Sequence, residues 1–193
     1  MPTMAGGISD AHGVAAALTA GADRVWVGTA LVAALEANAH PDYQRRLVES
    51  NGATLRTTAF GPEWPDQQYR LLATQTVRSA DEDPMGGAAL HDETIGHTRL
   101  FPHSANLAHD IPTHSALPPT PAAAGELDLM AYPAGQGVVN VRSVAPAARI
   151  IDTMMSGARQ ILAGPSNAAR RSGSGTTSAE LGPRYPASRR PSF

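Results

Sequence analysis

Apolar residues near the start of the chain form short β-type runs, each followed by a helical stripe. Thr3–Ala5 is a short apolar run that leads into a glycine pair. The next stripe extends from a cap at Ser9 or Asp10 to about Ala20, and it places apolar side chains on one helical face. We therefore predict a strand, a glycine turn and a helix, in that order.

The same order repeats directly afterwards. Gly21 is suited to end the first helix, because glycine readily adopts the left-handed conformation found just beyond helix C-termini. Arg24–Val27 is rich in β-forming residues and ends at Gly28, and Thr29 then begins a second helix that extends to about Ala37. This repetition predicts an α/β fold with two consecutive βα units of a parallel sheet.

The periodicity weakens after this point. A third helix is predicted from Pro41 to Ser50, because proline is favoured in the first turn of a helix. Thr54–Ala59 favours an extended strand, and Asp66–Arg78 favours a helix. Residues 61–135 are otherwise dominated by Pro, Gly, His, Asp and Thr, which predicts a long irregular excursion.

A last apolar stripe predicts a helix from about Pro146 to Leu162, ended by Gly164 and Pro165. Beyond it, Ser, Gly, Arg, Thr and Pro replace nearly all large apolar residues, which is typical of a disordered tail. The chain therefore divides into four predicted parts. These are the βα units at 1–60, an irregular extension at 61–135, a helical region at 136–164 and the tail at 165–193.

The amino-acid composition excludes several classes of catalytic and binding site. The sequence has no Cys and all 15 basic residues are Arg, which excludes disulfides, thiolate nucleophiles and lysine Schiff bases. The net charge of −2 gives no basic excess that would indicate nucleic acid or an anionic membrane as a partner. No apolar run approaches the roughly 18 residues of a membrane span, and Met1–Met4 lacks the features of a secretory signal. We therefore expect a soluble, cytoplasmic protein.

Two glycine turns are the strongest candidate for a functional site. Gly6 and Gly7 follow the first predicted strand, and Gly28 with Thr29 follows the second. Neighbouring βα turns of a parallel barrel lie side by side at the carboxyl ends of the strands, where phosphate commonly binds. Glycine lets backbone N–H groups approach phosphate oxygens, and a helix start and the Thr29 hydroxyl add further donors. The alternative is a pair of ordinary βα turns in which Thr29 caps a helix.

The residues around these turns resemble the phosphate-binding end of the nitronate monooxygenase (2-nitropropane dioxygenase) family. The similar segments are Met4–Leu18, Gly21–Asp23, Val25–Thr29, His40–Tyr43 and Ala131–Val138. The resemblance covers residues 1 to about 163 and is weak between about 80 and 130. In that family the two turns surround the phosphate of FMN. The FMN contacts implied for this chain are Ala5, Gly6, Gly7, Gly28 and Thr29.

The resemblance implies the last two βα units of a TIM (β/α)8 barrel, followed by the extension and the tail. A closed barrel of this kind needs roughly 250 residues, more than the 193 present. The earlier strands of the family carry the flavin-ring contacts and a catalytic His, and no residue of this chain matches that His. We therefore predict no catalytic residue here, weak FMN retention, and dependence on an N-terminal partner chain or a homo-oligomer to cover the open sheet.

The activity implied by the resemblance is FMN-dependent oxidation of alkyl nitronates, derived from nitroalkanes, by O2. Flavin enoyl-reductases share the fold and look alike in these turns, so a relative of that class is one alternative. A non-catalytic barrel remnant, with at most a phosphate site, is the other. Nitronate-dependent O2 uptake, NADH-dependent reduction of an enoyl thioester, or neither would distinguish the three.

Other candidates carry weaker signals. Five of the seven His recur every five or six residues, a spacing that fits neither a helical pair nor a compact zinc signature. These are His91, His97, His103, His109 and His114. We expect a His-rich polar loop there and no metal site. Gly135 to Gly137 lacks the third glycine of a dinucleotide fingerprint, and the resemblance places it near the flavin edge. Trp26 is predicted to pack inside the fold.

Overall fold

The structure is a computed structural model that describes residues 1–61, 66–82, 93–99 and 108–164. Residues Met1–Leu162 form one compact unit, and the elements discussed below lie in it up to the last residue of the final helix. The second unit, Ala163–Phe193, is described only at its first two residues. The predicted disordered tail at 165–193 therefore lies outside the described residues.

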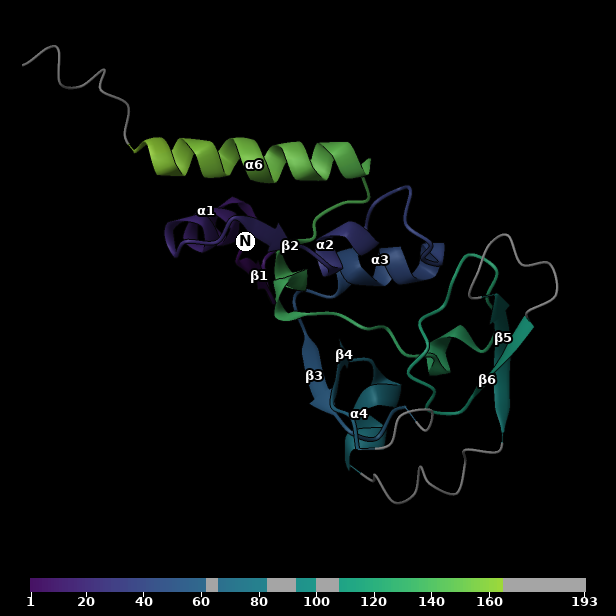
Figure 1. The fold of residues 1–193 in the computed structure, drawn as a ribbon. Coiled ribbons are helices and arrows are strands. Elements are labelled where there is room, and N and C mark those ends of the chain that lie inside the picture. Colours follow the sequence, from purple (N-terminus) through teal and green to yellow (C-terminus); the bar gives the residue numbers. More distant parts are fainter. Residues whose placement is uncertain (62–65, 83–92, 100–107, 165–193) are drawn as a thin grey trace, which may run out of the picture. The chain divides into compact units, whose positions relative to one another are not determined.

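The first predicted βα unit is confirmed. Strands β1 (Thr3–Ala5) and β2 (Arg24–Trp26) pair in parallel, and helix α1 (Ala11–Thr19) connects them (Figure 1). The carboxylate of Asp10 accepts a hydrogen bond of 2.8 Å from the Gly13 N–H and caps the start of α1. The helix ends before Gly21, whose φ of 91° is left-handed as expected.

The helix after β2 is shorter than predicted. Helix α2 covers only Thr29–Val32, whereas the apolar stripe had predicted a helix to about Ala37. The chain leaves the helical path because its backbone pairs with a distant segment. The Leu35 N–H donates to the Ala145 carbonyl at 3.0 Å, and the Ala145 N–H donates to the Ala33 carbonyl at 3.2 Å. Tertiary pairing therefore overrides local helix propensity at this point.

Helix α3 (Pro41–Glu49) matches the prediction, with proline at its first position. Strand β3 (Thr54–Thr57) then pairs antiparallel with strand β4 (Tyr69–Leu72), and helix α4 (Gln75–Glu82) follows. The prediction of one helix over Asp66–Arg78 is wrong, because β4 occupies the middle of that segment.

Strand β4 owes its conformation to partners on both sides. Beyond its ladder with β3, the Leu72 N–H donates to the Tyr132 carbonyl at 2.9 Å. The Ala134 N–H donates to the Arg70 carbonyl at 3.0 Å, so residues 132–134 act as a further partner of β4. Both contacts join positions about sixty residues apart in sequence, where local patterning carries no information.

Residues 61–135 contain regular structure that the sequence did not predict. Their described parts include a three-stranded antiparallel sheet in the order β6-β5-β7. Its strands are β5 (Thr94–Arg99), β6 (Ala108–Pro112) and β7 (Ala124–Gly125). Two 3₁₀ helices follow, η1 (Leu127–Leu129) and η2 (Gln136–Asn140). The expected irregular excursion is therefore wrong for these parts, since strand pairing between distant segments supplies the order.

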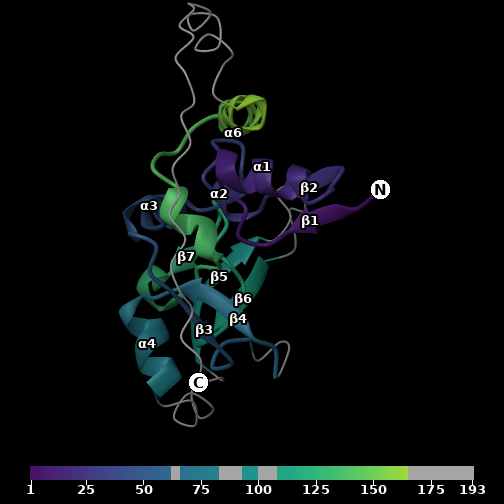
Figure 2. The same cartoon turned by 90° about the vertical axis from the view of Figure 1, so that its left-hand side faces the viewer.

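The last predicted helix is confirmed as α6 (Ala147–Ala163). It lies beside α1 (Figures 1 and 2). Met154 and Ala158 of α6 form a buried cluster with Val14 and Ala15 of α1. No helix among the described residues is both long and apolar enough to span a membrane. Trp26 does not pack inside the fold as predicted, because 71% of its surface is exposed on β2.

Candidate functional site

The two predicted glycine turns line one hollow of about 220 Å³ at the carboxyl ends of β1 and β2. Its lining residues are Gly6, Gly7, Ile8, Ser9, Trp26, Gly28, Thr29, Gly135 and Gly137. Four of the five positions singled out in the sequence, Gly6, Gly7, Gly28 and Thr29, therefore lie together. Ala5 is the last residue of β1 and does not line this hollow.

The glycines leave space that any side chain would reduce. Gly6 and Gly7 have φ values of 99° and 68°, a region that residues with a Cβ rarely adopt. A Cβ built on Gly6, Gly7 or Gly28 would meet no atom within 4 Å, so their backbone borders open space. A ligand can therefore approach the main chain of both turns directly.

Thr29 links this hollow to a distant segment. Its hydroxyl oxygen accepts a hydrogen bond of 2.9 Å from the Gly135 N–H. A hydroxyl that accepts in this way keeps its own hydrogen for donation to another group. Thr29 can therefore hold residues 132–140, which we call the return segment, in place and still donate to a ligand oxygen.

Gly137 completes the wall from the same return segment. A Cβ on Gly137 would lie 2.5 Å from the Ser9 hydroxyl oxygen and 2.9 Å from the Gly7 carbonyl oxygen. The backbone of η2 therefore packs directly against the first turn. The sequence had suggested only that Gly135 and Gly137 lie near a flavin. The sequence showed the spacing of these two glycines. It could not show their contact with a turn more than a hundred residues earlier in the chain.

Asn140 secures the same contact by hydrogen bonds. Its side-chain amide donates to the Ser9 hydroxyl and to the Asp10 carboxylate, each at 3.1 Å. The second oxygen of Asp10 already caps α1 through the Gly13 N–H. These bonds join the start of α1 to the end of η2 and fix the path of the first glycine turn.

The hollow suits an anion without using a cationic side chain. None of the described residues that line it is charged. The carboxylate of Asp10, the acidic residue next to it, is occupied by the Gly13 and Asn140 donors. Exposed N–H groups in glycine turns and at helix starts bind phosphate and other oxyanions by hydrogen bonding and by their partial positive charge.

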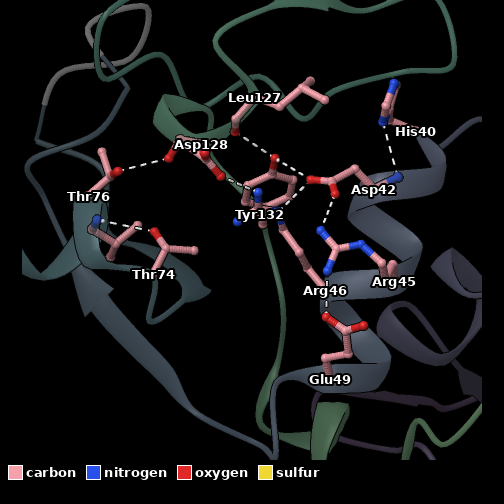
Figure 3. Close-up of polar contacts among 11 residues, drawn as sticks. His40, Asp42, Arg45, Arg46, Glu49, Thr74, Thr76, Leu127, Asp128 and Tyr132 are labelled. Carbon is pink, nitrogen blue, oxygen red and sulfur yellow. Dashed lines mark hydrogen bonds and ion pairs between the residues drawn. The ribbon is translucent and has the colours of Figure 1, made fainter.

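A second polar cluster contacts the return segment at Tyr132 (Figure 3). We call Asp42, Arg46, Tyr43 and Tyr132 the tyrosine clamp. Tyr132 is fully buried, and its hydroxyl donates to the Leu127 carbonyl at 2.6 Å. The Arg46 guanidinium lies 4.8 Å from the centre of the Tyr132 ring, which gives a favourable cation–π contact.

The clamp also attaches the return segment to α3. The rings of Tyr43 and Tyr132 lie 5.3 Å apart, and the Tyr43 hydroxyl donates to the Pro133 carbonyl. Arg45 and Arg46 both pair with Asp42, and Arg46 also pairs with Asp128 (Figure 3). Residues 132–135 thus reach the hollow from a rigid base on α3.

The charges of the clamp shift the titration of its carboxylate. Partial burial would raise the pKa of Asp42, but hydrogen bonds and charges from Arg46 and Arg45 outweigh it and lower the pKa to about 2. Burial, together with the nearby Tyr132, raises the pKa of the Tyr43 hydroxyl. Asp42 is therefore ionised and both tyrosines keep their protons near neutral pH, which suits a structural role.

The histidines give no site in the described part of the chain. No group of three or more His, Cys, Asp or Glu there could hold a metal ion. His97 and His109 lie exposed on β5 and β6, whereas His91 and His103 fall outside the described residues. His40 caps α3, its ring Nδ1 accepting from the Asp42 N–H at 3.1 Å.

Comparison with known sequences places the chain in context. The model of the family described as Nitronate monooxygenase matches residues 1–157. A curated relative from Bacillus subtilis (strain 168), described as a probable nitronate monooxygenase, is 44% identical over 56 residues. That alignment covers 29% of this chain and 16% of the relative.

Solved structures share the fold over most of the described chain. FabK from Thermotoga maritima matches with a TM-score of 0.59 and 25% identity, over 84% of this chain and 45% of its own. Nitroalkane oxidase from Streptomyces ansochromogenes matches with a TM-score of 0.54 and 24% identity, over 84% of this chain and 41% of its own. This chain therefore spans less than half the length of these structures.

Proposed function

Because the chain belongs to the nitronate monooxygenase family, whose members are oxidoreductases, we propose that its glycine-lined hollow binds the phosphate of FMN. The supporting observation is that Gly6, Gly7, Gly28 and Thr29 line one hollow. A Cβ added to any of these three glycines would meet open space. The size and the lack of charged lining residues fit a phosphate held by main-chain amides.

We further propose that β1, α1, β2 and α2 are the last two βα units of a (β/α)8 barrel. Two features support this. β1 and β2 are parallel strands with mostly exposed residues, although parallel sheets normally have both faces covered. The chain also spans 41% to 45% of the length of its structural relatives. An N-terminal partner chain or a second copy would then cover this sheet.

The proposed activity of the complete assembly is oxidation of alkyl nitronates by O2. Bound FMN would supply the redox chemistry, and the residues of this chain would anchor and orient it. Within the described residues we assign no catalytic group, because the hollow holds only glycines, apolar residues and hydroxyl-bearing side chains. Substrate activation would depend on groups contributed from outside these residues.

Titration of the purified chain with FMN and with riboflavin tests the phosphate site. Riboflavin lacks the phosphate, so it should bind at least about tenfold more weakly if the glycine turns supply the affinity. Inorganic phosphate should compete with FMN. Since we assign no flavin-ring contacts to the described residues, the protein should be colourless as purified and turn yellow only with excess FMN.

Two glycine variants give a matched comparison. Gly28→Ala adds a methyl group into the hollow, where a Cβ meets no other atom, and should weaken FMN binding. Gly21→Ala also adds a methyl group where a Cβ meets no atom within 4 Å, but outside the lining; its positive φ of 91° lowers stability without reaching the hollow. Equal FMN affinity for both variants, or equal affinity of the wild type for FMN and riboflavin, would count against the phosphate site. Tight stoichiometric flavin retention would contradict the partial-site proposal.

The two alternatives remain distinguishable by activity. A flavin enoyl-reductase would oxidise NADH with an enoyl thioester, and a nitronate monooxygenase would consume O2 with a nitronate. A non-catalytic remnant would do neither, even with added FMN. Size-exclusion chromatography with thermal melting tests the need for a partner, and a monodisperse monomer with a sharp melt would argue against it.

A further inference from the structure

A second, larger hollow adjoins the same turn at Gly28 and Thr29. It has a volume of about 590 Å³ and is open to solvent. It shares three lining residues with the phosphate hollow, namely Gly28, Thr29 and Gly135. A molecule bound in this second hollow, which we call the side hollow, would therefore lie next to a group bound at the glycine turns.

The walls of the side hollow are mostly apolar. They include Leu31 and Val32 of α2, Ala37, and the ring of Tyr43. Pro118, Pro133 and Ala134 add apolar surface from later segments. The Tyr43 hydroxyl is bonded to the Pro133 carbonyl, so this tyrosine contributes its ring more than a free polar group. Such a surface suits a short alkyl chain.

Arg70 is the one charged residue among the described residues that line the side hollow. It is half-buried, and among the described residues no carboxylate lies within ion-pair distance of it. One guanidinium nitrogen donates to the Thr54 hydroxyl at 3.3 Å. A guanidinium has five N–H donors, so most of the donors of Arg70 remain for a ligand.

The backbone holds Arg70 in a fixed position. Arg70 lies opposite Arg56 in the β3–β4 ladder. The Arg70 carbonyl accepts a hydrogen bond of 3.0 Å from the Ala134 N–H. Arg56 is exposed and bonds to Gln68, and it does not line the side hollow. Two arginines directly opposite each other repel, so a counter-anion beside Arg70 would relieve an unfavourable pair.

We propose that the side hollow binds a planar organic monoanion with a short alkyl chain, and that Arg70 recognises its anionic head. The inference rests on the proposed function, because an alkyl nitronate is such an anion. Its two oxygens share one negative charge across a flat group, as in a carboxylate. The planar fork of a guanidinium matches that geometry, whereas a lysine ammonium acts as a point charge. Arg70 would thus be a specificity-determining residue.

Chemical-shift titration of the isotopically labelled full chain with hexanoate tests this proposal. Hexanoate is a stable carboxylate that copies the flat anion and the alkyl chain. We expect amide shifts at Leu31, Ala37 and Ala134, weaker binding of acetate, and no binding of the neutral alcohol 1-hexanol at the same concentrations. Inorganic phosphate should instead shift Gly6, Gly7 and Gly28.

Two charge-matched variants identify the role of Arg70. Arg70→Gln should weaken hexanoate binding about tenfold or more, whereas Arg56→Gln, which removes the same charge from the opposite position, should change it by about twofold or less. Arg70→Lys should recover only part of the affinity. Equal losses in Arg70→Gln and Arg56→Gln, or 1-hexanol binding as well as hexanoate, would overturn the proposal.

A third variant keeps the test informative if Arg70→Gln fails to fold. Ala37→Phe fills the apolar wall and should weaken hexanoate more than acetate, while phosphate shifts at the glycine turns persist. If hexanoate shows no shifts while FMN and phosphate still bind, the side-hollow proposal fails and the phosphate proposal stands. If phosphate and FMN do not bind while hexanoate does, the phosphate proposal fails and Arg70 keeps its assigned role.

Discussion

The β1–β2 sheet and the tyrosine clamp differ sharply in how they are held. The sheet has two short parallel strands whose residues are mostly exposed, including Trp26 at 71%. In the clamp Tyr132 is fully buried, and it shares a buried cluster with Leu47 of α3, which is also fully buried. Tyr43 and Tyr132 of the clamp belong to a nine-residue cluster of buried hydrophobic side chains, whereas no such cluster among the described residues includes a residue of β1.

The glycine turns belong to the weaker of these two regions, although the proposed function depends on them. Their support comes from the return segment rather than from the sheet. Gly135 bonds to Thr29, Gly137 packs on Gly7, and Asn140 bonds to Ser9. The return segment is in turn fixed by the clamp through Tyr132 and Pro133. Thus the buried region is connected to the exposed glycine turns by hydrogen bonds and close packing through the return segment.

The largest effect on the free energy of unfolding should come from removing the Tyr132 side chain from the clamp. Tyr132→Ala removes a fully buried ring, its hydroxyl bond to Leu127 and its contact with Arg46. We expect a loss of roughly 3–5 kcal/mol in the free energy of unfolding, typical of a large aromatic replaced by alanine in a core. Trp26→Ala, on the exposed sheet, should change it by about 0.5 kcal/mol or less. Urea denaturation followed by circular dichroism measures both, and similar losses would remove the contrast between the regions.

A smaller effect should come from the contact between the two regions. Gly137→Ala places a methyl group 2.5 Å from the Ser9 hydroxyl oxygen and should cost about 1–3 kcal/mol through overpacking. Gly28→Ala adds the same group to open space and should cost less stability while weakening FMN binding. Thermal melts of the two variants measure the effect on fold stability, and FMN titrations measure the effect on FMN affinity. A Gly137→Ala protein as stable as the wild type would show that the return segment does not support the turn.

The smallest expected effect is a pH dependence confined to the clamp. The pKa of Asp42 falls from 3.8 to about 2 in the folded chain, so its ion pairs stabilise the fold fully above about pH 4. This stabilisation should be lost as the pH falls from about 4 towards 2, because the unfolded chain takes up the proton first. Asp42→Asn should therefore be less stable near neutral pH and show a shallower acid slope. Parallel slopes for wild type and variant in acid-dependent urea denaturation would contradict this.

Local turn chemistry made the first βα unit predictable. The Asp10 cap, the positive φ of Gly21 and the β-rich run before Gly28 all act within a few residues of one another. Parallel pairing of the two strands then followed from their order, and the convergence of Gly6, Gly7, Gly28 and Thr29 followed from the geometry of neighbouring βα turns.

The remainder depends on contacts between distant positions. The early end of α2 reflects pairing with Ala145, and β4 replaces a predicted helix because it pairs with Tyr132–Ala134. The family resemblance placed Gly137 near the flavin edge, but its contact with Gly7 could not be predicted because the two glycines are far apart in sequence. Trp26 was expected to pack in the core or the barrel, yet it is 71% exposed and lines the hollow among the described residues.

If the proposed partner chain and phosphate site are both correct, the edge of β1 left unpaired by the described strands would couple assembly to ligand binding. Among the described strands, β1 pairs with β2 alone, and both lead directly into the glycine turns. A chain that pairs with this edge would restrict the backbone of the glycine turns. A phosphate needs the same backbone in an ordered conformation. By thermodynamic linkage, a phosphate bound at the turns would then strengthen binding of the added chain at the β1 edge. The added chain would strengthen phosphate binding by the same factor.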